Sequence, residues 1–126
     1  MMTTGKSKTK KPKQRKQWVH LPSVRLDELI AEAIVDCYNE SEELTGIYTM
    51  IEDNLALPFT TIILGIEVKV ERIDLNEANE IVAICRRGRE RQSIPVLDLP
   101  LPDPRPVGAE WIEAYRRWGK LCGGRY

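Results

Sequence analysis

The sequence predicts an α+β fold: an N-terminal helix or helical hairpin, a small antiparallel curled sheet or partly closed barrel, and a short C-terminal helix. Apolar residues recur every three to four positions in the first part of the chain, as in an amphipathic helix, and every second position in the middle, as in a half-buried strand. With 126 residues, 42% of them hydrophobic, the chain is large enough for one domain with a modest core.

The first helical region begins after a candidate N-cap, Ser23. Apolar residues then follow at helical spacing: Leu26, Leu29, Ile30, Ala33, Ile34, Cys37 and Tyr38. Gly46 is the expected break, and the helical pattern beyond it must stop before Pro58. We therefore expect one long helix, or two helices joined by a tight turn, over residues 24–56.

Strand character appears next, in segments separated by polar or glycine turns: residues 60–64, 66–71, 81–85 and 91–97. We expect the turns at Gly65, at residues 76–79 and at Gly88. The apolar run at 81–85 suits a central strand. Pro95 places the last strand at an edge or a bulge, because proline cannot donate a ladder hydrogen bond.

A proline-rich connector and a final amphipathic segment complete the domain. Four prolines predict a stiff, extended connector: Pro100, Pro102, Pro104 and Pro106. After Gly108, a short closing helix is expected to present an apolar face made of Trp111, Ile112, Tyr115 and Trp118.

The N-terminus differs in charge from the rest of the chain. It carries seven basic residues and no acidic one: Lys6, Lys8, Lys10, Lys11, Lys13, Arg15 and Lys16. Such a segment predicts a disordered basic tail over 1–20, before a single domain at 21–119 and a C-terminal tail at 120–126. The remaining 12 basic and 19 acidic residues give the rest of the chain a net charge of −7. We expect a cytoplasmic protein with no membrane span and no secretory signal.

From Leu26 to Val68 the chain has ten carboxylates and no Lys or Arg. They are Asp27, Glu28, Glu32, Asp36, Glu40, Glu42, Glu43, Glu52, Asp53 and Glu67. An acidic block without internal counter-charge repels itself, and globular surfaces usually interleave the two signs. A hard divalent cation such as Ca²⁺ is the simplest partner that would neutralise it.

The spacing within this block suggests how one ion could be held. Four carboxylates at steps of four, four and three are expected along one helix face: Glu32, Asp36, Glu40 and Glu43. Glu52 and Asp53 could close over the same ion if the chain folds back after Gly46. The alternative is that the block is only a solvated acidic face.

Other constellations point to less specific chemistry. Arginines cluster around Gly88, namely Arg86, Arg87, Arg89 and Arg91, and could either hold phosphates or neutralise nearby carboxylates such as Glu71, Glu80 and Glu90. Three separated cysteines and the single His20 do not suggest a disulfide, a zinc site or a catalytic triad. An EF-hand is ruled out, because Asn79 and Cys85 replace the glycine and the final carboxylate of the loop that would start at Asp74.

Two stretches carry a family resemblance. The first stretch consists of Ile34-Val-Asp-Cys-Tyr, Glu42-Glu43, Gly46 and Ile51-Glu-Asp-Asn-Leu-Ala-Leu-Pro-Phe. The second stretch runs from Glu80 to Pro102 and is followed by Ala109-Glu-Trp-Ile-Glu-Ala-Tyr-Arg-Arg-Trp. Over residues 26–119 the chain resembles the CcbP-type calcium-binding proteins of cyanobacteria and other bacteria. It departs from their pattern at Ile47, where relatives often have an aromatic residue, and in the basic tail.

This resemblance implies a small, non-enzymatic cytoplasmic protein that binds Ca²⁺ without an EF-hand and buffers or sequesters it. The acidic positions carried over are Asp36, Glu40, Glu42, Glu43, Glu52 and Asp53. An alternative function is a nucleic-acid or protein adaptor that acts through the basic tail and the turn at Arg86–Arg91, and its protein partner is unknown.

Overall fold

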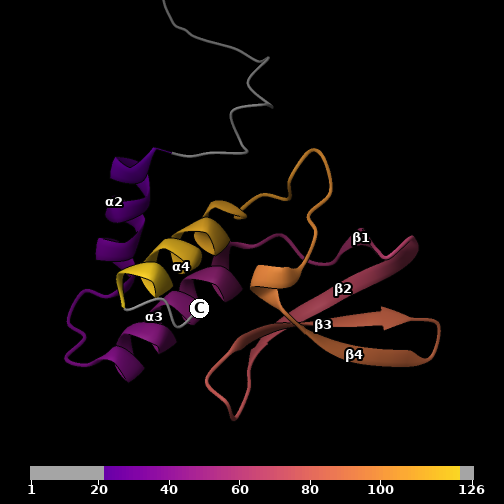
Figure 1. Cartoon of the computed structure of the whole chain (residues 1–126), viewed down its shortest axis with the longest axis horizontal. Coiled ribbons are helices and arrows are strands. Elements are labelled where there is room, and N and C mark those ends of the chain that lie inside the picture. Colours follow the sequence, from indigo (N-terminus) through magenta and orange to yellow (C-terminus); the bar gives the residue numbers. More distant parts are fainter. Residues whose placement is uncertain (1–21, 123–126) are drawn as a thin grey trace, which may run out of the picture.

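A computed structural model of the chain describes residues 22–122. The helices in this range are α2 (Ser23–Ala33), α3 (Glu40–Asn54) and α4 (Glu110–Leu121). The strands are β1 (Phe59–Ile63), β2 (Ile66–Leu75), β3 (Ile81–Arg87) and β4 (Glu90–Pro95), followed by a 3-10 turn, η2 (Val96–Asp98). The helices gather at one end of the sheet, and two strand hairpins extend away from them (Figure 1). The prediction of an α+β fold with two N-terminal helices and a closing helix is confirmed.

The sheet is an open antiparallel meander in the order β1-β2-β3-β4. The predicted curling or partial barrel closure is wrong, because β1 and β4 lie at opposite edges and do not pair with each other. Four strands joined by short hairpins are too few to close around a filled interior. The placement of Pro95 on an edge strand and of residues 81–85 in the interior of the sheet is confirmed.

The break between the first two helices does not occur at Gly46. Residues 34–39 leave the helical path instead, with Asp36 in the left-handed region at φ 67°, and Gly46 lies inside α3. A Cβ atom at Gly46 would overlap the carbonyl oxygen of Ala33. Glycine is therefore needed here for close packing of α3 against α2, not for a turn.

The core lies between the helices and one face of the sheet. The predicted apolar face of α4 is confirmed: Trp111, Ile112, Tyr115 and Trp118 are all buried, and they belong to the same core cluster as residues of α2, α3 and β2. The connector between η2 and α4 is tied to the sheet by Thr61, whose Oγ1 donates a 2.6 Å hydrogen bond to the carbonyl oxygen of Pro100. Among the described residues, none of the helices is long and apolar enough to cross a membrane.

Candidate calcium site

The loop between α2 and α3 is held by hydrogen bonds at the start of α3. Asn39 caps the helix, its side chain accepting from the backbone N–H of Glu42 at 2.9 Å. The Glu42 carboxylate in turn accepts from the backbone N–H of Tyr38 at 2.7 Å. This reciprocal arrangement resembles a capping box and fixes the entry of the chain into α3. The Asn39-x-x-Glu42 spacing is a sequence signal for this helix start that the apolar pattern alone did not reveal.

The charges of three candidate ligands act on the thiol of Cys37 in this loop. Desolvation is the largest cause that raises the pKa of Cys37, and the negative charges of Glu42, Glu43 and Asp36 raise it further. All three carboxylates therefore contribute to the field at one sulfur atom. Negative charge therefore accumulates at this loop.

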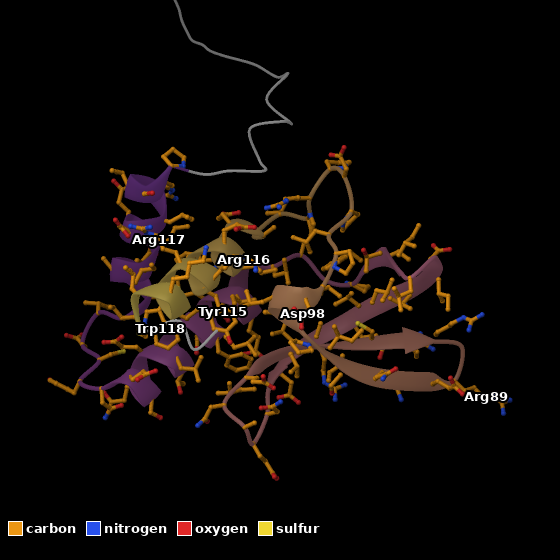
Figure 2. All side chains as sticks on the ribbon, in the orientation of Figure 1. Arg89, Asp98, Tyr115, Arg116, Arg117 and Trp118 are labelled. Atoms are coloured by element: carbon orange, nitrogen blue, oxygen red, sulfur yellow. The ribbon has the colours of Figure 1, made fainter. Side chains whose placement is uncertain are left out.

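Glu40 and Glu43 lie in the first turn of α3, and both residues are half-buried. The carboxylate of Glu43 accepts a 2.9 Å hydrogen bond from the indole Nε1 of Trp118. Trp118 projects from α4 toward α3 (Figure 2). This bond connects the candidate site to the closing helix, so Trp118 is a natural spectroscopic reporter for it.

Glu52 and Asp53 lie in the last turn of α3, away from the first group. Glu43 and Glu52 are nine positions apart on one continuous helix, which separates them by about 14 Å along its axis. Oxygen ligands of one Ca²⁺ ion lie within about 5 Å of one another, because each is 2.3–2.6 Å from the ion. The expected fold-back of Glu52 and Asp53 over the same ion is wrong, because α3 runs without interruption through Gly46. Glu52 instead accepts a 3.1 Å hydrogen bond from the Tyr48 hydroxyl.

The single acidic helix face predicted from the four-residue spacing is also wrong. Glu32 lies on α2, Asp36 lies in the loop, and Glu40 and Glu43 begin α3. The candidate ligands near the α2–α3 loop therefore come from the loop itself and from the first turn of α3. Among residues 22–122, no group of three or more His, Cys, Asp or Glu side chains is positioned to hold a metal ion.

The carboxylates of the described residues differ in whether a basic side chain forms an ion pair with them. Five of the candidate ligands form no ion pair within the described residues: Asp36, Glu42, Glu43, Glu52 and Asp53. At the start of the acidic block, however, Glu28 pairs with Arg25 and Asp27 pairs with Arg117, whose Nε lies 2.7 Å from Asp27 Oδ1. The hydrogen bond from Arg117 keeps the pKa of Asp27 below its ordinary value. The expectation that a partner outside the chain must neutralise the block is therefore wrong for these two residues, since Arg25 and Arg117, which lie outside the block in the same chain, pair with them.

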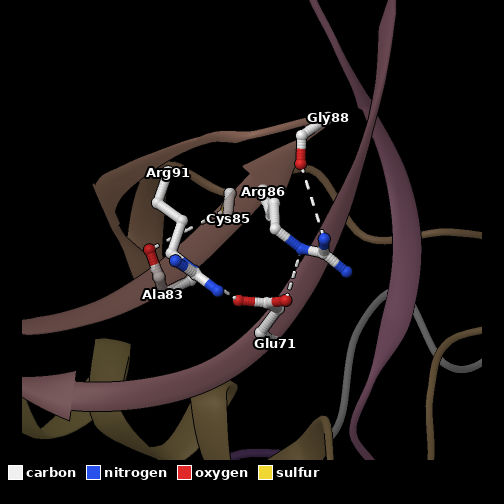
Figure 3. A network of polar contacts seen from close by, with 6 residues as sticks. All are labelled: Glu71, Ala83, Cys85, Arg86, Gly88 and Arg91. Carbon is white, nitrogen blue, oxygen red and sulfur yellow. Dashed lines mark hydrogen bonds and ion pairs between the residues drawn. The ribbon is translucent and has the colours of Figure 1, made fainter.

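The arginines near Gly88 also differ in whether they form ion pairs. Arg86 and Arg91 both pair with Glu71 (Figure 3), and the hydrogen bond from Arg91 is the largest cause that lowers the pKa of this carboxylate. This confirms that part of the cluster neutralises a nearby acid. Arg89 instead lies at the outer tip of the β3–β4 hairpin, far from the helices (Figure 2).

Comparison with known families identifies the class of protein to which this chain belongs. The family model for CcbP-type proteins, described as "Calcium binding", matches residues 27–119. The chain therefore belongs to the CcbP calcium-binding family. No curated protein matches it. No solved structure matches it either.

Proposed function

We propose that this protein binds Ca²⁺ at the α2–α3 loop and the first turn of α3 and serves as a non-enzymatic calcium buffer inside the cell. The ligands we propose are Asp36, Glu40, Glu42 and Glu43. Membership of a calcium-binding family supports the identity of the ion. The observation that supports this location is that Asp36, Glu42 and Glu43 form no ion pair within the described residues, although the negative charge of each raises the pKa of Cys37.

The charges at this location favour a cation despite the direction of the helix dipole. The N-terminus of α3 carries a partial positive charge equivalent to roughly +0.5, which opposes a bound cation. Four carboxylates outweigh it, and Ca²⁺ accepts six to eight oxygens in irregular geometry. A site that uses several carboxylates falls in the range of about 10⁻⁷ to 10⁻⁵ M for Kd.

Ligation here requires the carboxylates to turn toward a common point. Asp36 is exposed and has room to change rotamer, whereas Glu42 would have to release its hydrogen bond from the Tyr38 backbone N–H. Glu40 and Glu43 are half-buried and supply the less mobile side of the site. Water would complete the coordination shell. Mg²⁺ should compete poorly, because it requires near-ideal octahedral geometry and gives up its water reluctantly.

Glu52 and Asp53 form a separate, weaker candidate location at the other end of α3. Carboxylates at a helix C-terminus are disfavoured by the dipole, and α3 has no basic residue in its last turn. A cation there would relieve this repulsion, but two carboxylates supply few of the ligands that Ca²⁺ takes. We therefore propose this pair as a second site of lower affinity.

Calorimetric titration of the full chain with Ca²⁺ and then with Mg²⁺ tests this function. We expect saturable Ca²⁺ binding that Asp36→Asn weakens by about tenfold and that the double change Glu52→Gln and Asp53→Asn leaves largely intact. The reverse pattern would place the main site at the C-terminal end of α3. An absence of Ca²⁺ binding by the unmodified protein would refute the proposal.

The alternative adaptor function has less support in the described residues. Arg86 and Arg91 are engaged by Glu71, so only Arg87 and Arg89 of the arginine cluster remain without a described ion pair. The basic tail on which nucleic-acid contact would mainly depend lies outside the described residues. A steep loss of nucleic-acid binding with added salt would support this second function.

A further inference from the structure

One edge of the sheet has free backbone hydrogen-bonding groups. β1 is an outer strand, paired with β2 in a register that joins Ile63 to Ile66 across the two-residue turn Leu64–Gly65. In such a hairpin, alternate residues of β1 bond to β2, and the N–H and C=O groups of Thr60 and Ile62 point away from the sheet. Within residues 22–122, these groups form no other hydrogen bond.

The two edges of the sheet are protected to different degrees. β4 carries Glu90, Arg91 and Pro95, which are residue types that prevent another strand from adding to an edge. β1 has the sequence Phe-Thr-Thr-Ile-Ile, without a charge or a proline, and Ile62 is 61% exposed. The β1 edge is therefore the one that is open to an additional strand.

The connector between η2 and α4 forms a wall beside this edge (Figure 1). Thr61 fixes the wall through its 2.6 Å hydrogen bond to the carbonyl oxygen of Pro100. The resulting slot has a volume of about 410 Å³ and is lined by β1, Glu67 and residues 100–103 of the connector. Because Pro100 and Pro102 restrict the backbone of the connector, the slot is largely preformed.

The charge of the slot indicates the chemistry of its occupant. Glu67 and Asp103 line it, and none of the described lining residues is basic. The nearest cation along β2 is Lys69, which is the cross-strand partner of Thr60 and lines an adjoining hollow with Pro58, Phe59 and Thr60 instead of the slot itself. The slot therefore complements a segment that is extended, apolar in part and positively charged.

We propose that this slot binds an extended, lysine- or arginine-containing segment of a partner protein, which adds to β1 as a fifth strand. Main-chain hydrogen bonds to Thr60 and Ile62 would supply affinity, as in other cases of strand addition. Glu67 and Asp103 would select the basic side chains. This site is distinct from the proposed calcium site and does not depend on it.

Binding of a synthetic peptide to the full chain tests the proposal. The probe is a capped hexapeptide of alternating lysine and valine, compared with a matched peptide in which glutamate replaces lysine. We expect the lysine peptide to bind, with or without Ca²⁺, and to slow hydrogen exchange at the amides of Thr60 and Ile62. The glutamate peptide should not slow exchange at either amide.

Charge reversal in the slot supplies the matched variants. Glu67→Lys should weaken binding of the lysine peptide roughly fivefold, because it removes one attraction and adds one repulsion. Glu77→Lys is the control, since Glu77 is an exposed carboxylate in the β2–β3 turn outside the slot. It should leave peptide affinity unchanged.

Three results would overturn this proposal. The first is no binding of the lysine peptide at millimolar concentration. The second is slowed exchange on β4 or the helices in place of Thr60 and Ile62. The third is that these two amides are already protected in the free protein, because the chain's own N-terminal segment or a second copy would then occupy the edge.

Discussion

The carboxylates around the α2–α3 loop and those on the sheet and α4 have the same chemistry but opposite surroundings. Glu71 lies between two arginines, and Glu113 pairs with Arg105 at 3.1 Å. Asp36 and Glu42 have no such partner within the described residues. The presence or absence of an ion pair separates the acids that the fold neutralises itself from those that we propose bind an external cation.

Stability alone does not explain this division. Exposed ion pairs such as Arg25–Glu28 contribute about 0–1 kcal/mol each, so acids at the surface lose little stability when no arginine pairs with them. The carboxylates without ion pairs do, however, create a local excess of negative charge that attracts a divalent ion. The comparison therefore concerns function more than folding.

Calcium itself should produce the largest effect on the unpaired region. Because Ca²⁺ binds the folded site and not the unfolded chain, it should raise the free energy of unfolding by about 2.7 kcal/mol at a concentration 100 times Kd. Urea unfolding with Ca²⁺, compared with chelator and with equal Mg²⁺, measures this. Identical unfolding curves in Ca²⁺ and chelator would show that the carboxylates without ion pairs do not bind Ca²⁺.

Disturbing the packing that supports the loop should have the next largest effect. Gly46→Ala would push α3 away from the Ala33 carbonyl and lower the free energy of unfolding by about 1–3 kcal/mol. Ca²⁺ affinity should fall as well, because the loop joins these two helices. Thr49→Ala is the control on the exposed side of α3, where the stability should change little. A Gly46→Ala protein as stable as the unmodified one would show that α2 can shift without cost.

Asp36→Asn removes one negative charge from the α2–α3 loop while keeping a side chain of nearly the same shape. Asparagine tolerates the left-handed conformation at this position, so the stability of the calcium-free protein should stay within about 0.5 kcal/mol. Removal of one ligand charge should weaken Ca²⁺ binding by about tenfold. If the calcium-free protein instead loses several kcal/mol, Asp36 has a structural role and is not a ligand.

The pH dependence of folding should be the smallest effect, and it should come from the paired region. Arg117 and Arg91 lower the pKa values of Asp27 and Glu71 from their ordinary values of 3.8 and 4.5. Carboxylates with lowered folded-state pKa values stabilise the protein above those ordinary values and lose this contribution as pH falls through the lowered ones. Below about pH 4.5, Asp27→Asn and Glu71→Gln should therefore reduce the slope of stability against pH. Urea midpoints measured between pH 7 and 3 test this, and an unchanged slope would contradict it.

The sequence was sufficient to predict the elements but not all of their connections. The change in apolar period located the helices and strands correctly, because burial on one face imposes that period directly. Gly46 was misassigned because glycine serves both as a helix breaker and as the residue that permits two helices to approach closely. The apolar pattern gives no sign of the true break near Asp36, and only the capping signal at Asn39 and Glu42 marks it.

The candidate site was predictable only in part for a similar reason. The acidic block pointed to this region, and Asp36 lies in the α2–α3 loop while Glu42 and Glu43 lie in the first turn of α3. The sequence could not show that Asp27 is paired with Arg117, which is 90 residues away. It also could not show that Glu52 and Asp53 lie at the opposite end of an unbroken helix.

The central claim is that unpaired carboxylates at the α2–α3 loop bind Ca²⁺ and that arginine-paired ones do not. Calorimetric Ca²⁺ titration of Glu43→Gln beside Glu113→Gln tests it most directly. Glutamine at position 43 keeps an acceptor for the Trp118 indole, so the fold is retained while a ligand charge is lost. We predict that Glu43→Gln weakens Ca²⁺ binding by about tenfold and that Glu113→Gln leaves it unchanged. Equal affinities in the two variants, or a loss only in Glu113→Gln, would contradict this account.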